Sequence, residues 1–335
     1  MPTSDKPNVV YILTDQWRAK ATGYNGDANA ITPNIDRLAS ESIDFTNAIG
    51  TAPVCTPARA ALLTGRYPTT TGMFMNDIPL NPDEQSIGKV FKAGGYETGY
   101  IGKWHVDGHG RASCIPPERR QGFDYWKVLE CTHNYQNSEY YEGDDPIIKT
   151  WSGYDAFAQT EDACEYIRQH LEKPFFLTLS LGPPHFPHNN APKEFQDRFD
   201  PEAIQFSPNV AFEDAESEAF CRKEAAGYYA HIAALDGCIA TVVETLKNLD
   251  LEENTILIFA SDHGEMMGSH DHTPCKKQIF WDESCRVPYL LRYPPLTEDQ
   301  QGRKATTPFG TVDIMPTLLS LCGLDIPEAV EGRDL

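Results

Sequence analysis

The chain has 335 residues, of which 40% are hydrophobic and 23% are charged, and its formal net charge is −21 at pH 7. This composition is typical of a globular protein with a large core, and no apolar run is long enough to span a bilayer. The acidic balance argues against nucleic acid and against a general polyanion-binding surface, so an anionic substrate would need a locally positive pocket. We expect no membrane as a partner.

Strand-like and helix-like segments alternate along the chain. The continuous apolar run 8–13 predicts a strand that is buried on both faces. Further strands are expected at 96–101, 175–181, 255–260 and 288–293. Helices are expected at 32–39, 58–63, 86–93, 156–171, 218–249 and 311–321. The alternation predicts an α/β fold, with a large, mostly parallel (mixed) central sheet sandwiched by helices.

The first expected helix has Thr32 at its N-cap position and Pro33 in its first turn. We expect residues 1–335 to form a single catalytic domain. The segment 111–153 is aromatic and charged, without clear periodicity, and we interpret it as an irregular insertion near the mouth of the site.

The cysteine pattern and the N-terminal residues bear on the cellular compartment. Nine cysteines are scattered without C-x-x-C pairs, which is typical of a reducing compartment. Residues 1–7 are polar and contain no apolar signal core. The chain as given is therefore expected to be cytoplasmic, or periplasmic or secreted if a signal peptide has been removed.

Polar motifs directly follow four of the expected strands, after Leu13, Ile101, Leu181 and Ala260. In open α/β sheets, binding and catalytic sites form at the carboxyl ends of the strands. These four segments are therefore expected to converge on one edge of the sheet.

A fifth motif, C-x-P-x-R-x₄-T-G, begins at Cys55 and includes Pro57, Arg59 and Thr64. Taken alone, it also fits a buried cysteine followed by a helix that starts at the proline. The pattern resembles the signature of the type I sulfatases. In that family a maturation enzyme oxidises the cysteine to formylglycine (3-oxoalanine), and the hydrated aldehyde is the nucleophile. The resemblance implies that Cys55 has this role.

Two acidic segments are candidates for a metal site. An aspartate at a strand end, such as Asp15, is about as often a helix cap as a ligand. Asp15 and Asp262 would repel each other without a cation between them. Both segments resemble sulfatase metal-binding segments, which implies Asp15, Gln16, Asp262, His263 and position 55 as ligands of Ca²⁺, or of Mg²⁺ or Mn²⁺. Gln16 and His263 depart from the Asp and Asn that many sulfatases have there.

The resemblance to the sulfatases implies that the basic and histidine motifs act on the substrate. Seen singly, Lys103, His105 and the pair Lys276-Lys277 equally fit surface or packed positions. The sulfatase pattern implies that Arg59, Lys103 and Lys277 neutralise the transferred group, and its spacing favours Lys277 over Lys276. It also implies that Arg59 holds the nucleophile.

The same pattern gives two histidines and one asparagine a role. It implies that His185 protonates the leaving oxygen and that His105 accepts a proton from position 55. Asn76 lies 21 residues after Cys55 and is a candidate substrate-binding residue (76 − 55 = 21).

The resemblance extends from Asn8 to about Leu335 and implies an alkaline-phosphatase-like fold with a short or absent C-terminal subdomain. It implies metal-dependent hydrolysis of a small sulfated sugar or aryl sulfate. Two alternatives remain open: a phosphonate monoester or phosphodiester hydrolase with the same site, and an inactive relative that binds sulfated glycans. The oligomeric state cannot be predicted from this sequence.

Overall fold

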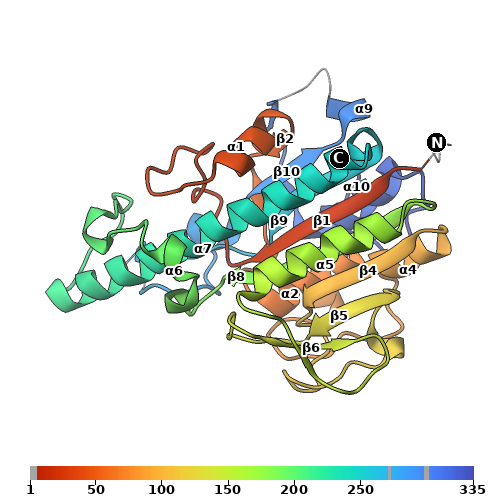
Figure 1. Cartoon of the computed structure of the whole chain (residues 1–335), viewed down its shortest axis with the longest axis horizontal. Helices are drawn as coiled ribbons and strands as arrows, with labels where there is room; N and C mark the ends of the chain where they lie inside the picture. The colour runs from red at the N-terminus through yellow and green to blue at the C-terminus, as the bar shows by residue number, and fades with distance from the viewer. Residues whose placement is uncertain (1–5, 271–272, 298–301) are drawn as a thin grey trace.

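A computed structural model describes residues 6–270, 273–297 and 302–335. Residues 1–5 of the polar N-terminal segment therefore lie outside the described residues. Within the described chain, a ten-stranded mixed sheet forms the middle layer (Figure 1). In sheet order its strands are β11 (Lys304–Ala305), β2 (Ile43–Phe45), β10 (Tyr289–Arg292), β9 (Thr255–Ser261), β1 (Asn8–Asp15), β8 (Phe175–Pro184), β4 (Glu97–Lys103), β5 (Tyr125–Leu129), β6 (Glu139–Glu142) and β7 (Lys149–Thr150). A second small sheet pairs β12 (Phe309–Gly310) with β3 (Ala48–Ile49).

The five neighbouring strands β9, β1, β8, β4 and β5 run parallel. Strand β10 is antiparallel to β9, which makes the sheet mixed. Leu13 is in register with Ala260 on one side and with Ser180 on the other, and Ser180 is in register with Gly102. The four strands that precede the polar motifs are therefore adjacent, and their carboxyl ends are level, as the sequence predicts.

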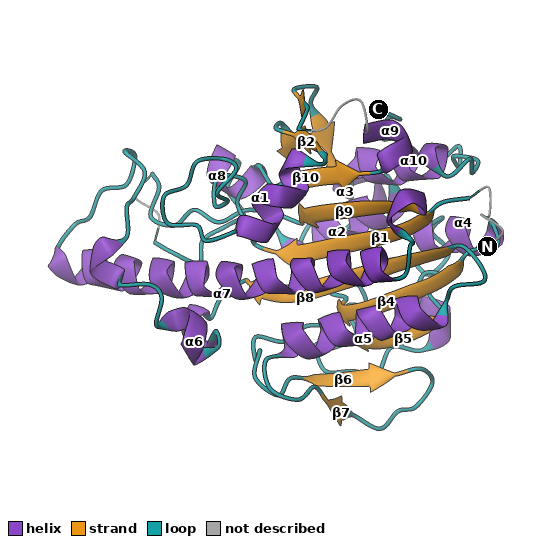
Figure 2. Cartoon of the chain, turned by 45° about the horizontal axis from the view of Figure 1, so that its top comes forward, coloured by secondary structure: helices purple, strands orange, loops and turns teal. Residues whose placement is uncertain are grey.

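Helices cover both faces of the sheet (Figure 2). One face carries α1 (Pro33–Ser40), α5 (Asp155–Gln169) and α7 (Ala215–Asn248), and the other carries α2 (Cys55–Thr64), α4 (Ile87–Ala93) and α10 (Thr311–Leu321). The shorter helices are α3 (Pro68–Thr71), α6 (Lys193–Gln196), α8 (Asp282–Cys285) and α9 (Pro294–Thr297), with 3₁₀ turns η1 (Pro117–Arg119), η2 (His188–Asn190), η3 (Pro201–Ala203) and η4 (Glu252–Asn254). Two apolar cores result, one on each side of the sheet.

Three helices differ from the sequence predictions in their first turns, and one of them, α7, begins at Ala215, three residues before its predicted start. Thr32 is at the N-cap of α1, but its side chain makes no capping bond and donates to Asp36 Oδ1 instead. Helix α2 begins at Cys55 and not at Ala58, because Pro57 is tolerated in the first turn, where backbone N–H groups have no intrahelical partner. Cys55 is therefore the first helical residue.

The segment 111–153 is less irregular than predicted. It contains β5, β6 and β7, which extend the sheet beyond β4. β6 and β7 lie at an edge and are half-exposed, so they lack the continuous apolar run that marks a buried strand. The rest of the segment forms loops, and Arg111 and His133 from these loops line the site described below.

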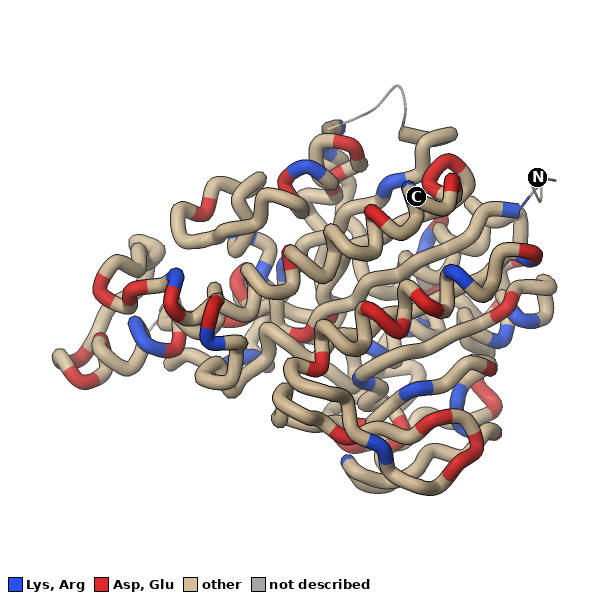
Figure 3. The backbone as a smooth tube through the Cα atoms, in the orientation of Figure 1, with Lys and Arg blue, Asp and Glu red and all other residues tan. Residues whose placement is uncertain are grey.

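Helix α7 is the longest helix of the described chain, with 34 residues. By length and composition it could cross a membrane, but 72% of its apolar window is buried inside the protein, as in a core helix. A capping box between Asp214 and Ser217 fixes its start. Acidic positions are spread over all layers of the molecule (Figure 3).

Candidate active site

The predicted site residues converge at the carboxyl edge of the parallel strands. Asp15 and Lys103 are the last residues of β1 and β4, and Gln16 and His105 come just after them. His185 follows β8, and Asp262 and His263 follow β9. Cys55 joins this edge as the first residue of α2. The N-terminus of a ten-residue helix favours negative charge there, on the thiolate or on a bound anion.

Cys55 is fully buried at the centre of this group. Its Sγ lies 3.2 Å from Lys277 Nζ, 3.3 Å from His263 Nε2, 3.6 Å from Asp15 Oδ1 and 3.8 Å from Lys103 Nζ. Burial opposes the charged thiolate, but Lys103, Lys277 and His263 outweigh it and hold the pKa of Cys55 well below its usual value. The site therefore favours an anionic group at this position.

Four side chains could hold a metal ion: Asp15, Cys55, Asp262 and His263 offer ligand atoms within 4.8 Å of one another. His263 Nε2 lies 3.5 Å from Asp15 Oδ1 and 3.7 Å from Asp262 Oδ1, which is too far for good hydrogen bonds. His263 Nδ1 lies 3.0 Å from the Gly264 carbonyl, to which only an N–H can donate, so in the neutral imidazole Nε2 carries the lone pair that would bind an ion. The donor set fits a divalent cation.

Gln16 lies beside this cluster. Its side-chain oxygen accepts a hydrogen bond from Lys277 Nζ at 3.0 Å, and its amide group donates to Glu265. The amide orientation is fixed by these two partners, and the backbone of Gln16 is in the left-handed region at φ 66°.

Arg59 holds the two acidic segments together. Its Nε donates to Asp262 Oδ2 at 2.9 Å and its Nη2 to Asp15 Oδ2 at 3.0 Å, while Nη1 donates to Ser180 Oγ and to the Lys103 carbonyl. Four of its five N–H donors are therefore in use. In this structure Arg59 positions the two carboxylates. Its implied contact with the transferred group and the nucleophile stays a prediction.

Asp15 and Asp262 are both fully buried, and their pKa values move in opposite directions. Burial and the nearby Cys55 act to raise the pKa of Asp15, but the positive charges of Lys103 and Arg59 outweigh them and lower it. Burial and the Asp15 charge raise the pKa of Asp262 to about 6. Lys103 Nζ, 2.7 Å from Asp15 Oδ2, links this pair to Cys55.

His185 and Lys277 form a direct pair. His185 Nδ1 lies 2.7 Å from the Phe186 carbonyl and therefore carries the proton, and its Nε2 accepts from Lys277 Nζ at 2.7 Å. Burial and Lys277 lower the pKa of His185 to about 3. The pair of His185 and Lys277 thus shares a proton beside the cavity, and the role of His185 as proton donor to the leaving oxygen stays a prediction.

His105 is buried near Cys55 and Cys131. Burial opposes its charged form, but the nearby Cys131 and Cys55 sulfurs raise the pKa of His105 to about 9. The role of His105 as the acceptor of a proton from the modified position 55 stays a prediction. Its Nε2 faces Asp77 Oδ1 at 3.4 Å.

A cavity of about 350 Å³ opens in front of Cys55. Its lining includes Asn76, His105, Arg111, His185 and Lys277. The Asn76 side-chain oxygen accepts from the Thr56 N–H at 3.0 Å, so this residue also caps the start of α2. The cavity is positive within an acidic protein, as binding of an anionic substrate requires.

Several residues of the site were missed from the sequence. Ser180, inside β8, anchors Arg59, and Arg111 makes a bidentate pair with Asp77 at the cavity mouth. No sequence signal marks these residues. Glu265 is different, because it follows Asp262-His263-Gly264 directly, and its place in that motif is a signal that could have identified it.

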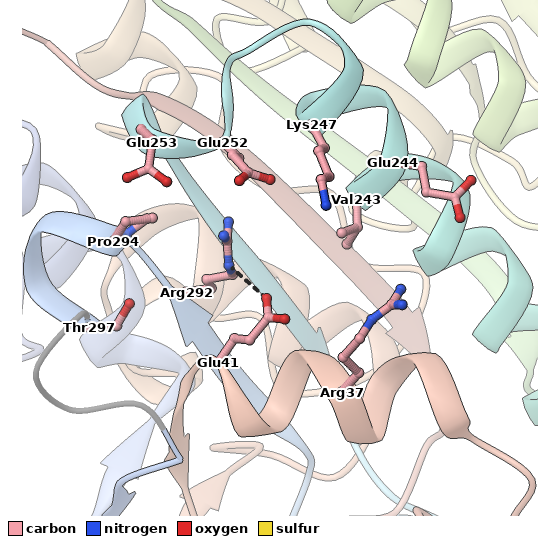
Figure 4. A pocket seen from close by; sticks show the side chains of 10 residues that line it. All are labelled: Arg37, Glu41, Val243, Glu244, Lys247, Glu252, Glu253, Arg292, Pro294 and Thr297. Atoms are coloured by element: carbon pink, nitrogen blue, oxygen red, sulfur yellow. Dashed lines mark ion pairs between the residues drawn. The ribbon is translucent and has the colours of Figure 1, made fainter.

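A larger cavity of about 500 Å³ lies away from this site (Figure 4). Arg292 at the end of β10 pairs with Glu41 there at 3.2 Å, and the C-terminal part of α7 forms one wall. Because Arg292 is in register with Leu257, this cavity is near the start of β9, whereas the catalytic motifs follow its end. Its lining holds charged side chains but neither a cysteine nor a histidine.

Comparison with known proteins decides the family. The sulfatase family model matches residues 7–324. The chain belongs to the sulfatase family. It is 50% identical over 332 residues to an ulvan-active sulfatase of Formosa agariphila, covering 98% of this chain and 64% of that protein. An endo-4-O-sulfatase of Bacteroides thetaiotaomicron is 32% identical, covering 99% of this chain and 72% of that one.

The fold agrees with this assignment. A crystal structure of the yidJ sulfatase from Bacteroides fragilis superposes with a TM-score of 0.91 at 32% identity, covering 100% of this chain and 78% of that chain. The sulfatase chain thus has the expected alkaline-phosphatase-like fold. It spans about two thirds of the length of the ulvan-active relative.

Proposed function

We propose that this sulfatase-family chain hydrolyses sulfate esters of a sugar to the alcohol and inorganic sulfate, with Cys55 converted to formylglycine. The observation that carries the proposal is the position of Cys55 Sγ, within 3.8 Å of two lysines, an aspartate and a histidine. A maturation enzyme that oxidises Cys55 is the partner that this proposal requires.

The metal ion belongs to the same proposal. Asp15, Asp262, His263 and the modified position 55 would hold it. Gln16 would join them by turning its side-chain oxygen from Lys277 to the ion. With an oxygen at position 55 this set favours Ca²⁺, with Mg²⁺ or Mn²⁺ as alternatives. When bound, such an ion withdraws charge from a sulfate oxygen and favours the ionised form of a hydroxyl at position 55. Arg59 keeps the two carboxylates in place for it.

The remaining side chains bind the anion and handle protons. Lys103 and Lys277 lie close enough to Cys55 to contact a sulfate group there, and the start of α2 adds its N-terminal dipole. The Lys277–His185 pair holds a proton for the leaving oxygen. His105 faces position 55, and conversion of Cys55 removes one of the two sulfurs that keep His105 protonated.

Replacing Lys103 with alanine should lower kcat by about 10²- to 10³-fold, because its charge is preorganised beside the reacting group. Steady-state kinetics with a sulfate ester, together with a thermal unfolding check, measure this effect. Lys92→Ala, on the exposed surface, is the matched control. A change in KM with kcat intact would show that Lys103 contributes to substrate binding alone.

Chelation should abolish turnover and lower the unfolding temperature, since an ion that binds only the folded state stabilises it. Activity and thermal unfolding are measured after EDTA treatment and again after addition of Ca²⁺, Mg²⁺ or Mn²⁺. Recovery identifies the effective ion. Full activity with an unchanged unfolding temperature in chelator would remove the metal from the proposal.

The substrate class is tested by competition between sulfated oligosaccharides, aryl sulfates and a phosphonate monoester with a matched leaving group. The proposal predicts a kcat/KM for the best sulfated sugar that is about tenfold or more above that for the phosphonate. The sulfatase names of the relatives favour this outcome over a phosphonate hydrolase. Absence of sulfate release from every ester would instead support an inactive, glycan-binding protein.

A further inference from the structure

A second group of metal-ligating side chains lies outside the catalytic cluster. His188, Glu224 and Cys275 offer ligand atoms within 4.8 Å of one another. His188 Nδ1 is 2.9 Å from Glu224 Oε2, and Cys275 Sγ is 3.7 Å from the same oxygen. The three residues come from η2, from α7 and from the segment that leads to Lys277, so the fold and not a local motif brings them together.

The chemistry of this group differs from that of the catalytic cluster. One imidazole, one carboxylate and one thiol form a mixed N, O and S set, which suits Zn²⁺ better than the hard ions Ca²⁺ or Mg²⁺. Three protein ligands leave one position for water. A cavity of about 220 Å³, lined by His188 and Glu224, gives an ion and a water molecule access to the group.

Two features of the group are unexplained by packing alone. His188 is 1% exposed, yet its Nε2 has no hydrogen-bond partner among the described residues. Cys275 has a left-handed backbone at φ 70°, an unfavourable conformation for a non-glycine residue that turns its side chain toward α7. Because Nδ1 faces Glu224, the unpartnered Nε2 lies on the other edge of the ring. An ion between the three side chains would therefore stabilise the Cys275 conformation but would leave Nε2 without a partner.

We propose that His188, Glu224 and Cys275 form a second metal site that binds Zn²⁺ or a similar transition metal ion. Binding releases the thiol proton of Cys275 to solvent, and the ion takes the place of the proton on His188 Nδ1, which moves to Nε2 of the same ring. Cys275 lies two residues before Lys277, and His188 three residues after His185. The ion therefore holds two segments against α7, one carrying His185 and the other carrying Lys277.

Co²⁺ is the spectroscopic probe for this site. It is added to the Cys55→Ser variant in the presence of excess Ca²⁺, because the catalytic cluster of that variant offers no thiolate. The proposal predicts a near-ultraviolet thiolate-to-cobalt band that saturates at one equivalent. The band is lost in Cys55→Ser/Cys275→Ser and kept in Cys55→Ser/Cys114→Ser, which removes a partly exposed thiol outside the group. No band in the first variant, or an unchanged band without Cys275, overturns the site.

A second measurement needs no cysteine variant. Iodoacetamide labelling of the unmutated chain is followed by mass spectrometry of the Cys275 and Cys114 peptides, with and without Zn²⁺. We expect Zn²⁺ to slow labelling of Cys275 by about tenfold or more and to leave Cys114 unchanged. Glu224→Gln should remove the protection. Equal rates with and without Zn²⁺, or equal slowing of both cysteines, would contradict the proposal whether or not the protein hydrolyses sulfate esters.

Discussion

Replacing Cys55 with serine should reduce steady-state sulfate release by about 10⁴-fold or more while the protein stays folded. Serine supplies one hydroxyl, whereas the hydrated aldehyde carries two on the same carbon, and the second is needed to expel sulfate. Each Cys55→Ser molecule should therefore release at most one equivalent of alcohol. The measurement is a single-turnover assay of alcohol and sulfate together.

Cys114→Ser is the matched control for this experiment, because Cys114 is partly exposed and lies outside the site. It should retain the activity of the unmutated protein. Repeated turnover by the Cys55→Ser variant at a rate near that of the unmutated protein would show that position 55 is not the nucleophile.

The second large effect is expected at Arg59. Arg59→Met keeps most of the volume but removes the hydrogen bonds to Asp15, Asp262 and Ser180, all in the protein interior. Breaking a buried ion pair from one side leaves uncompensated charge, so the free energy of unfolding should fall by about 3–5 kcal/mol. Urea unfolding in chelator measures the loss. Added Ca²⁺ should recover part of it, because the ion also neutralises the two carboxylates.

A surface arginine provides the comparison. Arg168 pairs with Glu161 and Glu165 on exposed parts of α5, and Arg168→Ala should leave the unfolding midpoint unchanged. Equal effects of the two arginine substitutions would contradict the positioning role of Arg59.

The central strands could be predicted from the sequence because burial on both faces demands continuous apolar runs, as in β1 and β9. The outer strands could not. β6 is half-exposed and reads Glu-Tyr-Tyr-Glu, and β2 has three residues, so their pairing depends on long-range contacts and not on local pattern.

Most site residues were found because they lie at or just after the end of a predictable strand, or within the Cys55 motif. Lys277 and Asn76 lie in neither place and were found only through the resemblance to the sulfatases. Their contacts were not predictable. Gln16 and His105 have left-handed backbones that no local pattern indicates, and these turns decide where their side chains point. The pairing of His185 with Lys277 and the four hydrogen bonds of Arg59 likewise depend on partners distant in sequence.

Mass spectrometry of the Cys55 peptide from protein that is turning over a sulfate ester tests the role of position 55 most directly. We predict a peptide lighter by the difference between a thiol and an aldehyde, in a fraction that rises in proportion to specific activity. Fully active protein whose Cys55 is entirely an unmodified thiol would contradict the formylglycine mechanism.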